Sequence, residues 1–572
     1  MADLDEVRFF FANGDLPPLC DRHLFFHRRH VTEPIASRIR CVKTAVMTSL
    51  VPLILLCPCW LFAQAFDLPW AGYGHDAQHT AISATAAQGL NGIHWSTPVD
   101  LNPQTTGGDL YIHYGSAAVT AGNTVFVPVK TGATDGFEVQ AFSGGSGALL
   151  YTLRTDYALP PHYWTPPYGL ALSVRLAGAL PERAAALRSR MPVPGPKLVE
   201  RLYYPGAGGT VYYRDDVDSP TGPSGQIAFY GNGLYAANQA VFNGAVQIST
   251  PLTTDNLGNV FFGFIAQGSN PANLVSGIAR ISRDGTGSWI SARSFSAGDN
   301  AITQVAANCA PALSNDQSTL YFAVSTGAEF GTGYLVAADS VTLTPKAHLE
   351  LMDPRGGLAT VSSDSSASPM VGPDGDVYFG VLETPCCSSH NGRGWLLHFD
   401  AALTETKTPG SFGWDDTASV VRSSLVPSYT GSSPYLVLTK YNNYAGAGSG
   451  NGVNQLAVLD PNGQQRDEYS SSPVTVMKEV LTIAGVTPDL QNGFPNAVRE
   501  WCINTAAIDP VSKSALVNSE DGVLYRWDFA TNTFTQRVRL TSGLGEAYTP
   551  TVIATDGTVF AINDAVLFAV GL

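Results

Sequence analysis

The chain has 572 residues and a formal net charge of −15, and only 14% of its residues are charged, against roughly 25% in average soluble proteins. Glycine is plentiful, with 57 residues, which is typical of turn-rich β-structure. Because negative charge repels phosphate backbones and no basic stripe occurs in the mature region, we expect no nucleic-acid partner.

The first 65 residues are predicted to be an N-terminal extension and signal peptide. An apolar stretch from Met47 to Ala65 follows basic residues and ends in a small-x-small pattern, as signal peptidases require. We expect cleavage before Phe66, a mature domain over 66–572 that is secreted or periplasmic, and no membrane span in it. The alternative is an uncleaved N-terminal anchor.

A sequence repeat determines the predicted fold class. Its unit is a Ser/Thr-Pro or Ser/Thr-Ala step, a short apolar run, a Gly/Asp/Asn turn and a second strand beginning Val/Leu-Tyr/Phe. Eight copies start at Ser116, Thr165, Thr250, Ala310, Ser368, Ser423, Thr505 and Thr549. Where the spacing is clearest, successive copies are about 57 to 60 residues apart, which suits four strands and their loops.

One four-stranded sheet cannot bury both of its faces alone, so neighbouring copies must stack. We predict an all-β fold, an eight-bladed β-propeller of four-stranded antiparallel blades. The last copy stops at Leu572 after three strands, and the strand-like run Gly92–Asp100 has no partner of its own. We expect this run to complete the last blade. The alternative, an open solenoid, would leave an edge prone to aggregation.

The segment at about 170–201 interrupts the second copy. It contains an Ala/Arg-rich run, Pro181–Met191, with proline at a favourable first helical position. We interpret it as a solvated excursion, with a short lid helix as the alternative.

The predicted strand order places the loops before each innermost strand on one face of the ring, together with the loops between the second and third strands. We expect a ligand site on that face, because loops on a rigid scaffold carry function. The predicted ligand-binding residues at the channel mouth are Trp164, Arg422, Asn504, Tyr548, Trp501, Glu500, Asp415 and Asp416. Aromatic rings stack on flat ligands, and carboxylates orient them, bind cations or act as bases.

Four cysteines remain after the predicted cleavage: Cys309, Cys386, Cys387 and Cys502. The adjacent pair lies in a loop of the fifth copy on the predicted ligand face. Either Cys386 and Cys387 form a vicinal disulfide, or one of them bridges to Cys309.

Three features support a family resemblance: the opening run Trp70–Thr80, the Ile93-His94-Trp95 that follows, and the repeated Asp-Gly-x-Val-Tyr/Phe strands. Over about residues 67–572, the sequence resembles the PQQ-like (pyrroloquinoline-quinone-like) repeat of quinoprotein alcohol dehydrogenases and their non-enzymatic relatives. The resemblance implies an eight-bladed ring. In the dehydrogenases an adjacent cysteine pair lies above the cofactor, but in an early blade, whereas the pair here falls in the fifth.

A complete ring with an incomplete dehydrogenase signature favours a monomeric binding or scaffold protein, whose ligand is a small molecule, a carbohydrate or a protein. One alternative is a dehydrogenase of alcohols or sugars that uses PQQ and calcium, with Glu500 and Asn504 as a candidate calcium pair. A further alternative is a carbohydrate-active lyase or hydrolase that uses Asp415 and Asp416.

Overall fold

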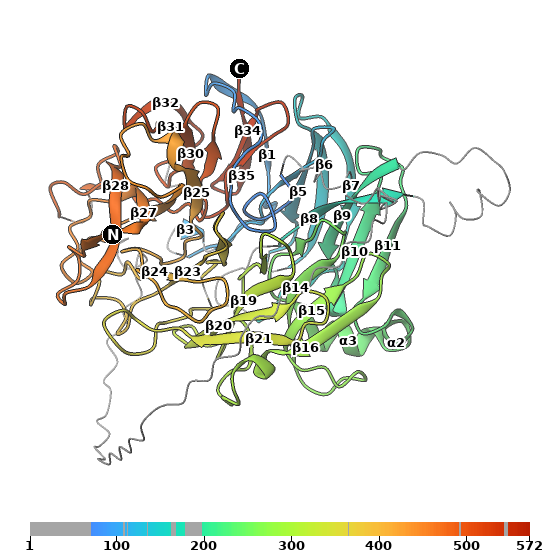
Figure 1. Ribbon diagram of the computed structural model, residues 1–572. Coiled ribbons are helices and arrows are strands. Elements are labelled where there is room, and N and C mark those ends of the chain that lie inside the picture. The colour runs from blue at the N-terminus through green and yellow to red at the C-terminus, as the bar shows by residue number, and fades with distance from the viewer. Residues whose placement is uncertain are drawn as a thin grey trace, which may run out of the picture. The chain divides into compact units, whose positions relative to one another are not determined.

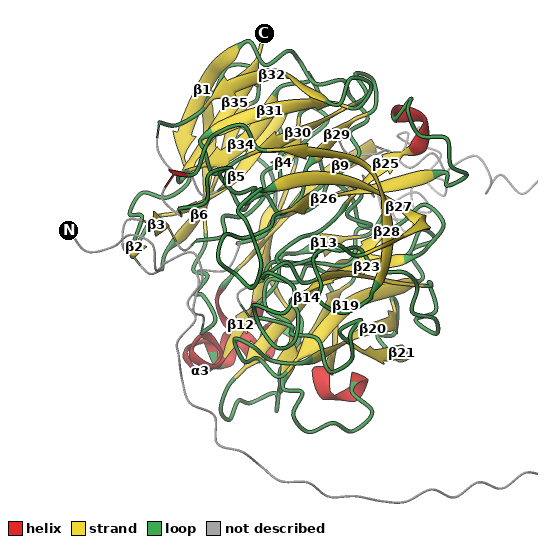
Figure 2. Cartoon of the chain, turned by 90° about the vertical axis from the view of Figure 1, so that its left-hand side faces the viewer, coloured by secondary structure: helices red, strands yellow, loops and turns green. Residues whose placement is uncertain are grey.

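The computed structural model describes residues 70–106, 109–110, 112–133, 135–161, 168–177, 197–363, 365–490, 493–542 and 547–572. As predicted, the chain forms an eight-bladed β-propeller of antiparallel sheets, and strands dominate Figures 1 and 2. The helices α2 (Asn232–Ala237) and α3 (Gln239–Ala245) are short. Within the described residues, no helix is long and apolar enough to cross a membrane.

Blades are numbered in chain order, and the strands of each blade are called A to D from the channel outwards. Before the first blade, β2 (Thr105–Thr106) pairs with β3 (Asp109–Leu110). Blade 1 contains β4 (Ala118–Val119), β5 (Thr124–Lys130), β6 (Phe137–Ser143) and β7 (Leu149–Arg154). Blade 2 contains β8 (Ala171–Ala177), β9 (Lys197–Pro205), β10 (Thr210–Asp215) and β11 (Ser224–Ala228). Blade 3 contains β13 (Thr253–Thr254), β14 (Val260–Ala266), β15 (Gly277–Ile281) and β16 (Gly287–Ser291), with β12 (Val246–Ile248) also paired to β14.

Blade 4 contains β18 (Ala312–Leu313), β19 (Thr319–Ser325), β20 (Gly333–Asp339) and β21 (Pro345–Glu350), with β17 (Gln304–Val305) also on β19. Blade 5 contains β22 (Met370–Val371), β23 (Val377–Val381) and β24 (Trp395–Phe399), and isolated bridges to Thr406 and Gly410 extend it outwards. Blade 6 contains β25 (Ser419–Arg422), β26 (Tyr435–Tyr441), β27 (Gln455–Arg466) and β28 (Thr475–Ala484). Blade 7 contains β29 (Ala507–Asp509), β30 (Ser514–Asn518), β31 (Val523–Asp528) and β32 (Thr533–Arg539). Blade 8 contains β33 (Val552–Ile553), β34 (Val559–Asn563), β35 (Val566–Gly571) and β1 (Gly92–Pro98).

Burial differs between the inner and outer strands of a blade. All seven residues of β5 are buried, whereas residues of the outermost strand β32 alternate between exposed and half-buried. Neighbouring blades cover both faces of the inner strands, and the outermost strand meets solvent. This arrangement explains why the second strand of each copy is an apolar run.

The N-terminal strand β1 closes the ring, as predicted. It pairs antiparallel with β35 from Gly92 opposite Gly571 to Pro98 opposite Val566, and Figure 1 shows it beside the C-terminal strands. The Trp95 ring stacks on Phe142 at 5.5 Å, and its indole N–H donates to the Gly144 carbonyl at 2.8 Å. Trp95 therefore fastens blade 8 to blade 1, and the open solenoid is ruled out.

Two copies of the repeat start elsewhere than predicted. Strand β25 begins at Ser419, so the step that opens blade 6 is Thr417-Ala418, and Arg422 ends its strand instead of starting it. Strand β8 begins at Ala171, after Gly169-Leu170. The predicted step at Thr165 lies outside the described residues. Gly169-Leu170 does not match the motif, whereas Thr417-Ala418 has its Ser/Thr-Ala form and lies just before the step that was chosen.

The interruption of the second copy falls between β8 and β9, the A and B strands of blade 2. The run Pro181–Met191 lies outside the described residues, so its interpretation as an excursion or a lid helix stays a prediction.

We expect deletion of Ala84–Leu101 to open the ring. The deletion removes the ladder between β1 and β35 and the packing of Trp95, which together contribute roughly several kcal/mol. Thermal unfolding should occur at a clearly lower temperature, whereas Val511→Ala, at a position 68% exposed, should change little. An unchanged melting temperature in a monomeric deletion variant would contradict this role of β1.

Candidate functional site at the channel mouth

The segment Trp70–Ser83, called here the channel segment, runs along the A strands that line the channel. Carbonyl groups of Trp70, Ala71, Ala77, Gln78, Thr80 and Ala81 accept backbone N–H bonds of 2.7 to 2.9 Å. The donors are Val119, Leu172, Leu313, Val371, Val420 and Ile508. They belong to blades 1, 2, 4, 5, 6 and 7. One short segment therefore accepts hydrogen bonds from backbone N–H groups on the inner edges of six blades.

Tyr73 projects from the channel segment into a polar network. Its hydroxyl lies 3.0 Å from the Ser366 carbonyl, 2.8 Å from the Thr417 hydroxyl, and in contact with the side-chain carbonyl of Asn504. The Asn504 amide donates to the Ser366 hydroxyl at 2.9 Å and to the Asp415 carbonyl at 3.3 Å. Burial raises the pKa of Tyr73 well above its usual value, so its phenol remains protonated at neutral pH.

Asp415 is a buried residue of this network with a left-handed backbone, φ 47°. Its carboxylate accepts from the Ser366 N–H at 2.7 Å and from the Ser366 hydroxyl at 2.8 Å, and it lies 3.7 Å from His113 Nε2. Burial opposes ionisation, but His113, Lys440 and the Ser366 bonds outweigh it and hold the pKa of Asp415 below its usual range. Asp415 is therefore ionised. Burial lowers the pKa of His113, against the opposing effect of the Asp415 carboxylate.

Asp416 has the opposite protonation behaviour from its neighbour. Burial raises its pKa to about 7, although Lys440 and a 2.6 Å bond from the Thr439 hydroxyl favour the charged form. The site thus contains one firmly ionised carboxylate and one that titrates near neutral pH. A pair of carboxyl groups with separated pKa values is what acid–base chemistry requires, although each already has protein partners.

A narrow cavity opens beside this network. Its described lining residues are Tyr73, His113, Tyr114, Ser116, Gly169, Leu170, Pro251, Ser366, Tyr548 and Pro550. The rings of His113 and Tyr548 are 4.7 Å apart and tilted by 52°. Phenol, imidazole and hydroxyl groups at the wall of a cavity suit a small polar ligand.

A second cavity lies between blades 4 and 5. Cys309, Ala367 and Trp414 line it, together with apolar residues of β23. Ser365 and Ala367 belong to the same loop as Ser366 of the first cavity. Burial raises the pKa of the Cys309 thiol to about 12, so this thiol is unreactive at neutral pH.

The predicted ligand-binding residues divide into three groups. Tyr548 lines the mouth cavity. Asn504 and Asp415 bond to Ser366 of its wall, and the Asp416 carboxylate accepts from Thr439 on β26. Arg422 is exposed at the far end of β25, where the motif had been misplaced. Trp164 lies outside the described residues.

Trp501 and Glu500 also lie elsewhere than predicted. Trp501 is only 1% exposed and packs against Tyr525 and Phe534 within blade 7, so it offers no surface for stacking. The Glu500 N–H donates to Glu520 at 2.9 Å. The carboxylates of Glu500 and Glu520 and the Cys502 sulfur lie within 4.8 Å of one another, and the Asn504 amide is directed elsewhere, to Ser366 and Asp415.

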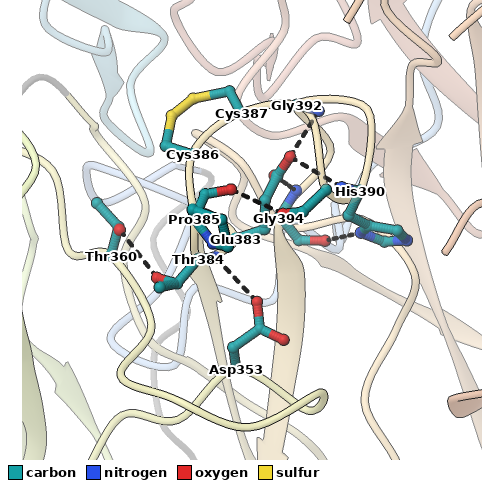
Figure 3. The surroundings of a disulfide bond; sticks show 11 residues. Asp353, Thr360, Glu383, Thr384, Pro385, Cys386, Cys387, His390, Gly392 and Gly394 are labelled. Carbon is teal, nitrogen blue, oxygen red and sulfur yellow. Dashed lines mark hydrogen bonds between the residues drawn. A yellow bond between two sulfur atoms is a disulfide. The ribbon is translucent and has the colours of Figure 1, made fainter. Parts of the chain in front are cut away.

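The two adjacent cysteines form a disulfide in the loop between β23 and β24 (Figure 3). Cys309 and Cys502 are free thiols. The buried Glu383 carboxylate organises this loop by accepting N–H bonds from His390, Gly392 and Gly394 at 2.7 to 3.2 Å. Cys387 is buried and Cys386 is partly exposed.

The described residues do not fit PQQ, which is a tricarboxylic acid. No lysine or arginine is among the described residues that line the mouth cavity. Lys440 lies close by, but its charge already compensates Asp415 and Asp416. Placing three further negative charges beside two buried carboxyl groups would be unfavourable, and Trp501 is not available to stack on the ring system.

Comparison with known proteins identifies the fold. A europium-containing methanol dehydrogenase aligns with a TM-score of 0.51 and 10% identity, over 87% of this chain and 90% of that one. The two proteins share a propeller fold. BamB from Moraxella catarrhalis aligns with a TM-score of 0.40 and 11% identity, over 84% and 100% of the two chains. Sqt1 from Saccharomyces cerevisiae gives 0.45 and 9%, over 85% and 100%.

No family model matches the sequence. No curated protein matches it either. At such low identity, the structural likeness speaks for the fold alone.

Sequence reasoning missed Tyr73, His113 and Ser366 as site residues. Tyr73 lies in the run that supports the family resemblance, which was the one available signal. His113 and Ser366 lie just before the repeat steps at Ser116 and Ser368, but the motif does not include them, and only the ring geometry brings them together.

We expect the contribution of Asp416 to stability to become less favourable as the pH rises from about 4 to about 7. Its folded-state pKa is raised to about 7, so the folded state holds a proton that the unfolded state has released, and this contribution is lost as pH rises. Asp416→Asn should reduce the change in unfolding free energy across this pH range by roughly a few kcal/mol. Melting temperatures across this pH range measure it; identical pH profiles for the variant and the parent would contradict the expectation.

Trp501→Ala should act on stability. Removing a buried tryptophan costs about 3 to 5 kcal/mol, whereas Arg422→Ala, at an exposed strand end, should cost little. Chemical denaturation measures both. An unchanged unfolding free energy for Trp501→Ala would show that packing of this ring does not stabilise the fold.

Proposed function

We propose that this protein is a non-catalytic binding protein that takes a small polar ligand in the mouth cavity. The observation that carries the proposal is the arrangement of Tyr73, His113 and Tyr548 around that cavity. These three residues line its wall, and Tyr73 comes from the channel segment. The propeller fold, which the chain shares with a dehydrogenase, is compatible with a binding role.

The protonation states support a ligand with hydroxyl groups. The neutral phenol of Tyr73 and the imidazole of His113 both offer hydrogen-bonding groups. The ionised Asp415 is already held by Ser366. A polyol or a sugar can form hydrogen bonds with the groups of such a wall, whereas burying a polyanion against it would be unfavourable.

The dehydrogenase alternative receives less support. Its proposed calcium pair is divided, because the Glu500 carboxylate lies with Glu520 and Cys502, whereas the Asn504 side chain contacts Tyr73, Ser366 and Asp415. The lyase or hydrolase alternative has Asp415 and Asp416 with separated pKa values. Both carboxyl groups are buried and bonded within the protein, so we rank binding above catalysis.

We further propose that the protein acts outside the cytoplasm, because the predicted signal peptide precedes the propeller. We also propose that it is a monomer. N-terminal sequencing of the exported protein should begin at Phe66.

A thermal-shift screen with sugars, polyols, and PQQ plus Ca²⁺ tests the binding site. We expect hits among the neutral polar compounds and no quinone absorbance after PQQ treatment. Tyr548→Ala should weaken binding of a hit by about 2 kcal/mol, the typical value of an aromatic contact in a desolvated site, or roughly 30-fold. Asp284→Ala, in the turn between β15 and β16, is the control. Stoichiometric uptake of PQQ with dye-linked alcohol oxidation would refute the proposal.

A further inference from the structure

The channel segment has its own folded structure. Its chain turns back on itself through N–H bonds from Ala71 to the His75 carbonyl at 2.8 Å and from Ala81 to the Gly74 carbonyl at 2.9 Å. Asp76 organises the second turn by accepting from the N–H groups of Gln78 and Thr80 at 3.1 and 3.0 Å. The segment is therefore a compact double turn and not an extended tether.

The contacts of this double turn with the blades involve side chains as well as backbone. Trp70 and His79 are 0% exposed. The His79 Nδ1 is 2.7 Å from the Pro369 carbonyl, and the Gln78 amide donates to the carbonyls of Leu313 and Ser314 at 3.1 and 3.0 Å. Together with the six backbone bonds and the Tyr73 network, these contacts connect the segment to most blades of the ring.

The connection between the channel segment and β1 is more open. Ala84 and Ala86 are exposed, and the Thr85 N–H is bonded only locally, to the Ser83 hydroxyl at 3.0 Å. The covalent link at Ala84 thus makes little contribution to the position of the segment compared with the contacts that precede it.

We propose that the propeller channel is a peptide-binding site whose ligand in this protein is its own channel segment. The A strands supply backbone N–H donors to the carbonyls of the peptide, and the loops that lead into blades 5, 6 and 7 contact the Tyr73 hydroxyl. The recognised ligand is a double-turn peptide with an anchoring tryptophan, tyrosine and histidine. The association does not require the covalent link to β1. This inference does not rest on the proposed small-molecule ligand, although Tyr73 belongs both to the segment and to the wall of the mouth cavity.

Cutting the chain after it has folded tests the inference. A protease recognition sequence is inserted in the full chain between Ala84 and Thr85, and the folded protein is cleaved and passed over a gel-filtration column under native conditions. Intact-mass analysis of the propeller peak then measures the peptide that has been retained. We expect stoichiometric retention and little change in melting temperature.

A matched pair of glycine variants separates specific binding from trapping. Gly74 has φ +62°, and a Cβ there would lie 2.8 Å from the His79 Cβ, so Gly74→Val should disrupt the double turn and release the peptide after cleavage. Gly233→Val, where an added Cβ meets nothing within 4 Å, should retain it. Release of the unaltered peptide, equal retention by both variants, or dimeric elution of the uncut chain would overturn the proposal. Each readout is separate from the ligand screen.

Discussion

The structure depends on how a ring of β-sheets satisfies the inner edges of its blades. Each A strand pairs with its B strand on one side only, which leaves N–H and C=O groups directed towards the channel. In this protein, the carbonyls of the channel segment accept six of those N–H groups. The same segment places Tyr73 among Ser366, Thr417 and Asn504. The residues that satisfy the inner backbone N–H groups therefore also form part of the candidate site.

Two N-terminal elements therefore have distinct structural tasks. The channel segment joins six blades at the centre, and β1 joins the last blade to the first at the periphery through its pairing with β35 and through Trp95. Both bonding patterns connect residues that are far apart in sequence. Ring integrity and the mouth cavity consequently depend on residues that precede the first blade.

The electrostatics of the mouth explain why a shared fold need not carry a shared cofactor. Dehydrogenase-like propellers offer a common ring, but the function of a ring is determined by the side chains at its mouth. Here the buried Asp415 and Asp416 interact with one lysine, Lys440, beside the Tyr73 network. Because two carboxyl groups share one ammonium group, a neutral ligand is favoured over an anionic one.

The sequence by itself determined the repeat, the eight blades, the strand order and the closing strand, because each depends on a local pattern that recurs about every 57 to 60 residues. It also predicted Asn504 and Tyr548 at equivalent positions of the repeats, and Asp415 and Asp416 in a loop on the same face. Only the tertiary structure decided that Trp501 is buried in blade 7, that Arg422 ends its strand, and that Tyr73 meets Asn504 across 431 residues of sequence. The physical reason is that such contacts depend on side-chain packing and ring closure, for which no local pattern exists.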